Sequence, residues 1–235
     1  MSDAMTSSQP PSYHDRIASL CQTLPPAVQL IAVTKQVPVA AMRAAYAAGL
    51  RNFGESRIQE AEVKQAELQD LPDITWHFIG HLQSNKVQKA LELFQWIHSV
   101  DNLKLAQRLN RLAESLAHKP QICLQVKIMP DPNKSGWTPD ELLVDLPQLD
   151  QCENLNIQGL MKIPPLGLSE SETLAVFQQA QELANKIRQQ GWSRLQMTQL
   201  SMGMSGDYRL AIQAGATMIR LGTILFGRRS ELPLA

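Results

Sequence analysis

The sequence lacks the features that mark secreted, membrane and nucleic-acid-binding proteins. Lysine plus arginine and aspartate plus glutamate each number 22, so no net charge attracts nucleic acid or an anionic membrane. The three cysteines are odd in number, widely spaced and in no Cys-x-x-Cys arrangement, which argues against disulfides and a zinc site. No apolar run approaches transmembrane length, and residues 1–11 lack the apolar core of a signal peptide. We therefore expect a soluble, cytoplasmic protein whose residues 1–11 form a disordered lead-in.

Strand-like and helix-like segments alternate along the rest of the chain. After a helical segment at 13–24, eight segments have strand character: residues 30–35, 52–54, 75–79, 96–100, 121–128, 156–161, 195–200 and 217–221. Each is followed by a helical segment or a helix start, beginning at residues 38, 55, 84, 101, 138, 169, 206 and 223. Eight alternations without a linker predict a single α/β domain over 12–235, a (β/α)₈ barrel. The alternative is an open doubly wound sheet, but no glycine-rich fingerprint follows the first strand.

Several residues are predicted to begin helices. Thr138 and Glu141 form a capping box with Pro139 at the first helical position. Ser84 and Asp101 each precede a helical segment and are expected to be N-caps.

The first strand ends on Lys35, at the edge of the sheet where α/β proteins place their chemistry. A desolvated lysine loses its proton more readily, and the free amine attacks carbonyl carbon atoms. The alternative is a lysine that reaches solvent or pairs with a nearby glutamate.

Two loops near the C-terminus have the character of a phosphate site. Ser201 and Ser205 follow the seventh strand, and Gly222 and Thr223 follow the eighth. In (β/α)₈ barrels the loops after these two strands commonly bind phosphate. Alternatively, the serines cap a helix and the glycine relieves crowding. A phosphate site facing Lys35 suggests a phosphorylated aldehyde held as a Schiff base, either pyridoxal 5′-phosphate or the sugar phosphate of an aldolase.

Five motifs resemble the YggS/PROSC family of pyridoxal-phosphate-binding homeostasis proteins, and in particular its cyanobacterial PipY-like branch. They are residues 32–35 (Ala-Val-Thr-Lys), 52–55 (Asn-Phe-Gly-Glu), 76–86 (Trp-His-Phe-Ile-Gly-His-Leu-Gln-Ser-Asn-Lys), 201–205 (Ser-Met-Gly-Met-Ser) and 220–223 (Arg-Leu-Gly-Thr). The resemblance runs from about Val28 to Arg228, and the eleven-residue motif is highly specific.

The resemblance implies the fold-type III barrel, like the N-terminal domain of alanine racemase. It implies that Lys35 holds the cofactor as a Schiff base and that Arg220 faces the pyridine nitrogen. The phosphate would be held by Ser201, Ser205, Gly222 and Thr223. The sequence departs from the family at one position, because Ser56 stands where the family usually has asparagine after Phe-Gly-Glu.

Three functions follow from these residues. The first is a protein of vitamin B6 homeostasis that holds pyridoxal 5′-phosphate without turnover and exchanges it with cofactor-dependent apoenzymes. The second is an amino-acid racemase or decarboxylase, and the third is an aldolase without a cofactor. Racemases of this fold use a second, β-rich domain, whereas this chain ends soon after the eighth strand, and Arg220 would oppose protonation of the ring nitrogen. These points favour the first function and a monomer.

Other polar residues are weaker candidates. His77 and His81 do not converge on one ion across a strand and its loop, and no carboxylate accompanies them, so no metal site is expected. His81 lies nearer the upper rim, toward the cofactor. Lys134 is either a solvated loop residue or lies over the barrel mouth.

Overall fold

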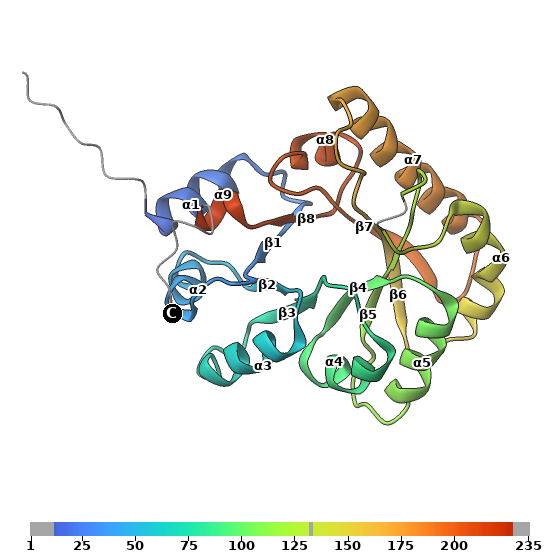
Figure 1. Cartoon of the computed structure of the whole chain (residues 1–235), viewed down its shortest axis with the longest axis horizontal. Helices are drawn as coiled ribbons and strands as arrows, with labels where there is room; N and C mark the ends of the chain where they lie inside the picture. The colour runs from blue at the N-terminus through green and yellow to red at the C-terminus, as the bar shows by residue number, and fades with distance from the viewer. Residues whose placement is uncertain (1–11, 132–133, 228–235) are drawn as a thin grey trace, which may run out of the picture.

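Eight parallel strands close into one barrel in the computed structural model of the chain, which describes residues 12–131 and 134–227. The strands lie in the centre and the helices surround them (Figure 1). The strands are β1 (Gln29–Val33), β2 (Asn52–Glu55), β3 (Thr75–Phe78), β4 (Trp96–Val100), β5 (Gln121–Gln125), β6 (Asn156–Lys162), β7 (Leu195–Met202) and β8 (Met218–Leu221). Each strand pairs with the next along the chain, and β8 pairs with β1. The predicted (β/α)₈ barrel is confirmed and the open sheet is wrong.

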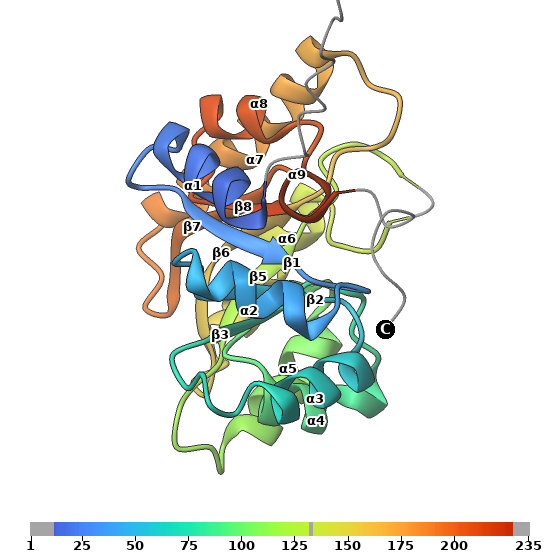
Figure 2. The same cartoon turned by 90° about the vertical axis from the view of Figure 1, so that its left-hand side faces the viewer.

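Helices follow the strands and one helix precedes them. They are α1 (Tyr13–Thr23), α2 (Val39–Ala47), α3 (Ile58–Glu67), the 3₁₀ turn η1 (Ser84–Lys86), α4 (Val87–Leu93), α5 (Leu103–Ala113), α6 (Pro139–Asp150), α7 (Glu170–Gln189), α8 (Tyr208–Gln213) and α9 (Thr223–Phe226). Helices α1 and α9 lie side by side (Figures 1 and 2), with Tyr13 packed edge-on against Phe226 at 6.0 Å between ring centroids. The first and last helices therefore cover the seam where β1 meets β8. None of the helices within the described ranges combines the length and the apolarity that crossing a membrane requires.

Local sequence signals predicted some helix starts and missed others. The capping box of Thr138 is confirmed, and its side chain accepts a hydrogen bond from the Glu141 N–H. The prediction for Ser84 is wrong, because this residue lies within η1 and α4 begins three residues later. The prediction for Asp101 is also wrong. Asn102 is the N-cap of α5 and accepts from Leu105 N–H at 2.9 Å, because the Asp101 carboxylate instead contacts the neighbouring Asn102 amide and His81.

The core has two unlike parts. Between strands and helices, apolar side chains such as Phe53, Leu109 and Phe177 are fully buried. Inside the barrel, at the level of the carboxyl ends, the buried side chains include His98 and Ser201, which contact each other across the lumen at 2.8 Å. The strand ends thus present a polar interior to whatever lies above them.

The predicted lead-in, residues 1–11, lies outside the described residues, as do residues 132–133 and 228–235. The assignment of 12–235 to a single domain stays a prediction.

Candidate cofactor site

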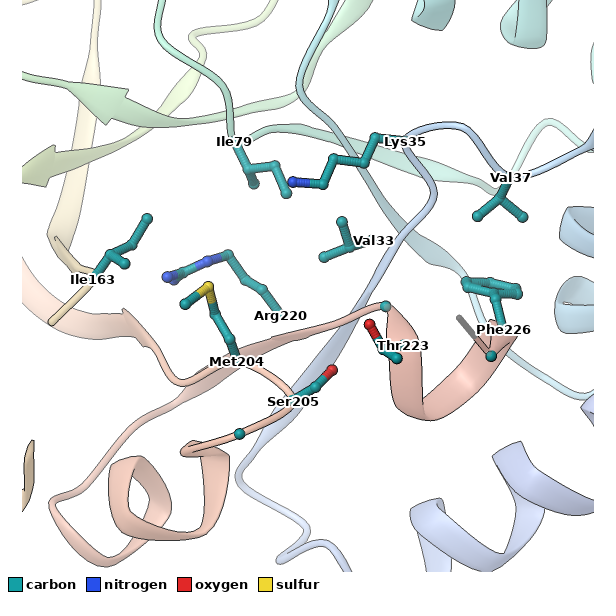
Figure 3. Close-up of a pocket in the computed structure, with 13 residues that line it drawn as sticks. Val33, Lys35, Val37, Ile79, Ile163, Met204, Ser205, Arg220, Thr223 and Phe226 are labelled. Atoms are coloured by element: carbon teal, nitrogen blue, oxygen red, sulfur yellow. The ribbon is translucent and has the colours of Figure 1, made fainter. Parts of the chain in front are cut away.

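A cavity of about 320 Å³ opens at the carboxyl ends of the strands (Figure 3). This volume lies at the lower end of the range of small-molecule sites. Five of the six predicted site residues line it, and Ser201 does not. The other lining residues are mostly apolar and come from several strand ends: Val33, Val37, Ile79, Ile163, Met204, Gly206, Phe226 and Gly227.

Lys35 reaches the cavity from the turn that follows β1. Because side chains alternate along a strand, the inward direction of Val33 is repeated at Lys35. The turn is closed by a hydrogen bond of 2.9 Å from Val37 N–H to the Thr34 carbonyl, and Gln36 has a φ of 60°. The lysine is thus presented by a tight turn with one residue in the left-handed region.

The loops after β7 and β8 form the opposite side of the cavity. Ser205 and Thr223 lie across from Lys35, and the Arg220 side chain extends to one side, next to Met204, in this view (Figure 3). At the start of α9 the Leu225 and Phe226 N–H groups donate to the Gly222 carbonyl, whereas the N–H groups before them lie in the first turn, where a helix offers no internal acceptor. Gly222 permits a close approach of the strands, since a Cβ there would lie 3.3 Å from the Val33 carbonyl oxygen. Hydroxyls and backbone donors therefore converge here, as phosphate binding requires.

Arg220 is a buried cation whose donors are used inside the barrel. One guanidinium nitrogen donates to Ser201 Oγ at 2.7 Å and another to the Lys162 carbonyl at 3.1 Å. Burial lowers the pKa of Arg220 to about 10, which leaves it charged at neutral pH. Ser201 is fully buried behind Arg220 rather than exposed to the cavity. The sequence grouped Ser201 with Ser205, and the structure separates them.

A chain of neutral side chains continues from Ser201 into the barrel, and we call it the histidine chain (Ser201, His98, His77 and Asn52). Ser201 Oγ lies 2.8 Å from His98 Nδ1, His98 Nε2 lies 2.9 Å from His77 Nδ1, and His77 Nε2 lies 3.0 Å from Asn52 Oδ1. Asn52 Oδ1 is an acceptor that Gln29 Nε2 also uses, at 2.8 Å.

The network assigns the direction of every donor in this chain. His77 Nε2–H donates to Asn52, so His77 Nδ1 accepts from His98 Nε2–H, and His98 Nδ1 accepts the Ser201 proton. Burial lowers the pKa of His77 to about 3 and that of His98 well below its ordinary value, so both rings are neutral at pH 7. The sequence analysis did not select His98 as a candidate residue. Polar residues at inward positions of successive strands could have indicated it.

A second polar group, which we call the ion cluster (Lys64, Glu55 and Glu60), lies outside the barrel wall beside the Lys35 turn. Glu55 was predicted to lie in a helix but belongs to β2, where its side chain is fully buried. Lys64 Nζ lies 2.8 Å from Glu55 Oε1 and 2.6 Å from Glu60 Oε1. Burial raises the pKa of the Glu55 carboxyl, and the Lys64 ammonium opposes that rise.

The remaining candidates lie away from the cavity wall. His81 is largely exposed, with Nδ1 3.3 Å from Asp101 Oδ2, and neither it, Lys134 nor Ser56 lines the cavity. Lys162, at the end of β6, was not singled out by the sequence; burial lowers its pKa to about 8. Among the described residues, no group of three histidine, cysteine, aspartate or glutamate side chains could hold a metal ion.

Comparison with known proteins shows the family to which the chain is similar. The sequence family described as alanine racemase, N-terminal domain, matches residues 12–230. A pyridoxal phosphate homeostasis protein of Synechocystis sp. is 57% identical over 219 residues, covering 93% of this chain and 98% of the relative. The protein of the same name from Pseudomonas aeruginosa is 46% identical over 205 residues, covering 87% and 86%.

Solved structures of similar proteins have the same fold. The structure of PipY from Synechococcus elongatus with pyridoxal phosphate bound superimposes with a TM-score of 0.88 at 56% identity, covering 92% of this chain and 100% of that one. An alanine racemase of Clostridium difficile has a TM-score of 0.72 at 17% identity, covering 92% of this chain and 56% of the racemase. The racemase shares the fold.

Proposed function

The chain belongs to the family of pyridoxal phosphate homeostasis proteins, and we propose that it binds pyridoxal 5′-phosphate in the cavity at the barrel mouth without turning over amino acids. The observation that carries this proposal is the placement of a lysine amine opposite two hydroxyls across one small cavity. That placement fits a phosphorylated aldehyde, which needs an amine at one end and phosphate donors at the other.

Each lining residue has a role in this proposal. Lys35 bonds to the aldehyde carbon, and Ser205, Gly222 and Thr223 hold the phosphate. The guanidinium of Arg220 faces the ring nitrogen, where its positive charge opposes protonation. Ser201 acts through Arg220, to which it is hydrogen-bonded, rather than on the phosphate. When bound, the cofactor supplies an electrophilic aldehyde and a conjugated ring.

The cavity supports binding better than turnover. Of the described residues that line it, only Lys35 and Arg220 are ionisable. Racemisation needs an acid or base on each face of the substrate, and a positioned base contributes about 10²–10⁴-fold to rate. Arg220 is too basic for that work, with a pKa of about 10, and two of its donors are engaged by Ser201 Oγ and the Lys162 carbonyl. The cavity walls can therefore bind and orient the cofactor but cannot move a substrate proton efficiently.

Three further points complete the proposal. The protein acts as a monomer in the cytoplasm, and it exchanges pyridoxal 5′-phosphate with cofactor-dependent apoenzymes. The cavity's opening at the barrel mouth supports exchange, because an amine from solvent can reach the aldehyde there.

The binding assignment is tested by borohydride reduction of the loaded protein followed by peptide mass spectrometry. We expect the adduct on Lys35, and we expect Lys35→Ala to lose both the adduct and the visible absorbance while keeping the fold. Lys134→Ala is the matched control and should keep both. An adduct on Lys127, Lys134 or Lys162 in the unchanged protein would show that the site is assigned wrongly.

The absence of turnover is tested separately. The loaded protein is incubated in deuterated water with a panel of L- and D-amino acids. We expect spectral shifts or cofactor release without consumption, because Lys35 can exchange its aldehyde with other amines. Deuteration at Cα at ordinary enzymatic rates, if it is lost in Lys35→Ala, would favour the racemase hypothesis instead.

A further inference from the structure

The Lys64 ammonium donates hydrogen bonds to three oxygens, and none of these belongs to a residue that lines the cavity. Its side chain is 8% exposed, and Nζ lies 2.6 Å from the Thr34 carbonyl oxygen, 2.8 Å from Glu55 Oε1 and 2.6 Å from Glu60 Oε1. An ammonium has three donors, so each is matched to one acceptor. The strand β2, the helix α3 and the turn after β1 therefore meet at one buried cation.

Two of these contacts hold the backbone on either side of Lys35. The Thr34 carbonyl, on the amino side, accepts from Lys64 Nζ and from Val37 N–H at 2.9 Å. On the carboxyl side, the Gln36 N–H donates to Glu60 Oε1, which Lys64 also binds. The Thr34 side chain is fixed as well, since its hydroxyl donates to Glu55 Oε1 at 2.7 Å.

The turn needs such support, because Gln36 has a φ of 60°. The left-handed region is unfavourable for any residue with a Cβ, and such outliers persist only where the surroundings over-determine them. The ion cluster itself is incompletely satisfied, since Glu55 Oε2 is buried with no hydrogen-bond partner among the described residues. The structure thus accepts two unfavourable features next to Lys35, the left-handed Gln36 and a Glu55 Oε2 without a partner in the described part of the chain. A cluster that served only to join β2 to α3 would need neither.

We infer that Lys64 and Glu60 are positioning residues for Lys35: they hold the turn of residues 34–37 in the left-handed conformation that aims the Lys35 amine into the cavity. This inference rests on the proposed function, in which Lys35 bonds to the aldehyde of the cofactor. It adds that presentation of Lys35 depends on a charged group outside the barrel, which never touches the ligand.

The test compares Lys64→Met, Glu60→Ala and the double variant Lys64→Met/Gln36→Gly with the unchanged protein. Lys89→Met is the matched control, because Lys89 pairs with Glu62 at 2.6 Å on the exposed surface of α4. The first readout is titration with pyridoxal 5′-phosphate, followed by borohydride trapping at Lys35. The second is amide hydrogen exchange of residues 36 and 37 without ligand.

We expect Lys64→Met to weaken binding by about 10- to 100-fold, the worth of one charge-assisted hydrogen bond, and to speed exchange at both amides. Glu60→Ala should do the same to a smaller extent and leaves Glu55 paired with Lys64. Glycine populates positive φ freely, so Gln36→Gly should recover much of the affinity in the Lys64→Met background. A purely structural role would not be rescued at residue 36.

Each outcome is decisive. The inference is overturned if folded Lys64→Met has the same cofactor affinity and the same amide exchange as the unchanged protein. If Lys64→Met does not fold, the same result for folded Glu60→Ala overturns it. Weakened binding that Gln36→Gly fails to improve would also overturn it. In both cases trapping on Lys35 in the unchanged protein leaves the proposed function standing, whereas trapping on another lysine removes both.

Discussion

Two basic side chains, Lys35 and Arg220, face the same cavity, and the protein holds them by opposite means. Lys35 is presented by a turn tied to the ion cluster, in which Lys64 lies between two carboxylates outside the barrel wall. Arg220 is held by the histidine chain, which is neutral and lies inside the barrel. The surroundings differ accordingly. A second charge beside Arg220 would be costly in the lumen, whereas the outer wall admits one carboxylate from β2 and one from α3.

The difference matters because the two groups fail in different ways. Removing one partner of a buried ion pair leaves a charge without compensation, which costs more than the pair contributed. Breaking a chain of neutral groups leaves unsatisfied donors and acceptors, each of smaller cost. The ion cluster should therefore dominate stability, and the histidine chain should dominate the response to pH.

The largest effect is expected from the ion cluster. Lys64→Met should lower the free energy of unfolding by about 3–5 kcal/mol, because Glu55 is left buried and unpaired. Lys64→Met combined with Glu55→Gln should recover a large part of that loss. The measurement is urea denaturation, with the exposed Lys89→Met expected to cost under about 1 kcal/mol. Equal losses for Lys64→Met and Lys89→Met would contradict the comparison.

The next effect concerns the histidine chain and acid. The unfolded protein takes up a proton on each histidine near pH 6.5, whereas burial lowers the pKa of His77 to about 3 in the folded state and that of His98 well below its ordinary value. Stability contributed by keeping these rings neutral is therefore complete above about pH 7 and is lost as pH falls toward 3. Between pH 7 and pH 5 the loss is about 2 kcal/mol for His77, and His98 adds a loss of the same sign.

Urea denaturation at a series of pH values checks this prediction. His98→Gln should reduce the slope of stability against pH by up to one proton, and His118→Gln, at an exposed position, should leave it unchanged. A slope that is the same in all three proteins would mean that the buried rings accept protons in the folded state.

The smallest effect separates two serines that the sequence treated alike. Ser205→Ala should weaken binding of pyridoxal 5′-phosphate about tenfold, or about 1.4 kcal/mol, and leave binding of phosphate-free pyridoxal unchanged. Ser201→Ala should weaken both ligands by the same factor, because it disturbs Arg220 rather than the phosphate donors. Titration of both variants with both ligands measures this. Selective loss of the phosphorylated ligand in Ser201→Ala would return that serine to the phosphate site.

Some predictions from local pattern failed where tertiary contacts compete. Asp101 has the chemistry of an N-cap, but Asn102 takes that position while the Asp101 carboxylate contacts His81. Glu55 looked like the start of a charged helix, yet it continues β2, because Lys64 and Thr34 supply the partners that a buried carboxylate needs. In both cases the deciding partner is a side chain of another element, or of a neighbouring turn, that a local pattern cannot specify.

The sequence by itself determined the barrel and the rim on which the candidate site lies. Alternating strand and helix periods settle which segments face the core, and a parallel barrel brings all its strand ends to one rim. Lys35 and the loops after β7 and β8 could therefore be expected to meet, and they line one cavity. Only the tertiary structure decided which side chains support the residues that line the cavity. Whether Ser201 faces the cavity or Arg220, and whether His98 reaches His77, depends on register and on side-chain direction across the lumen. Distances of this kind join residues as far apart in sequence as 98 and 201, and periodicity within one strand carries no information about them.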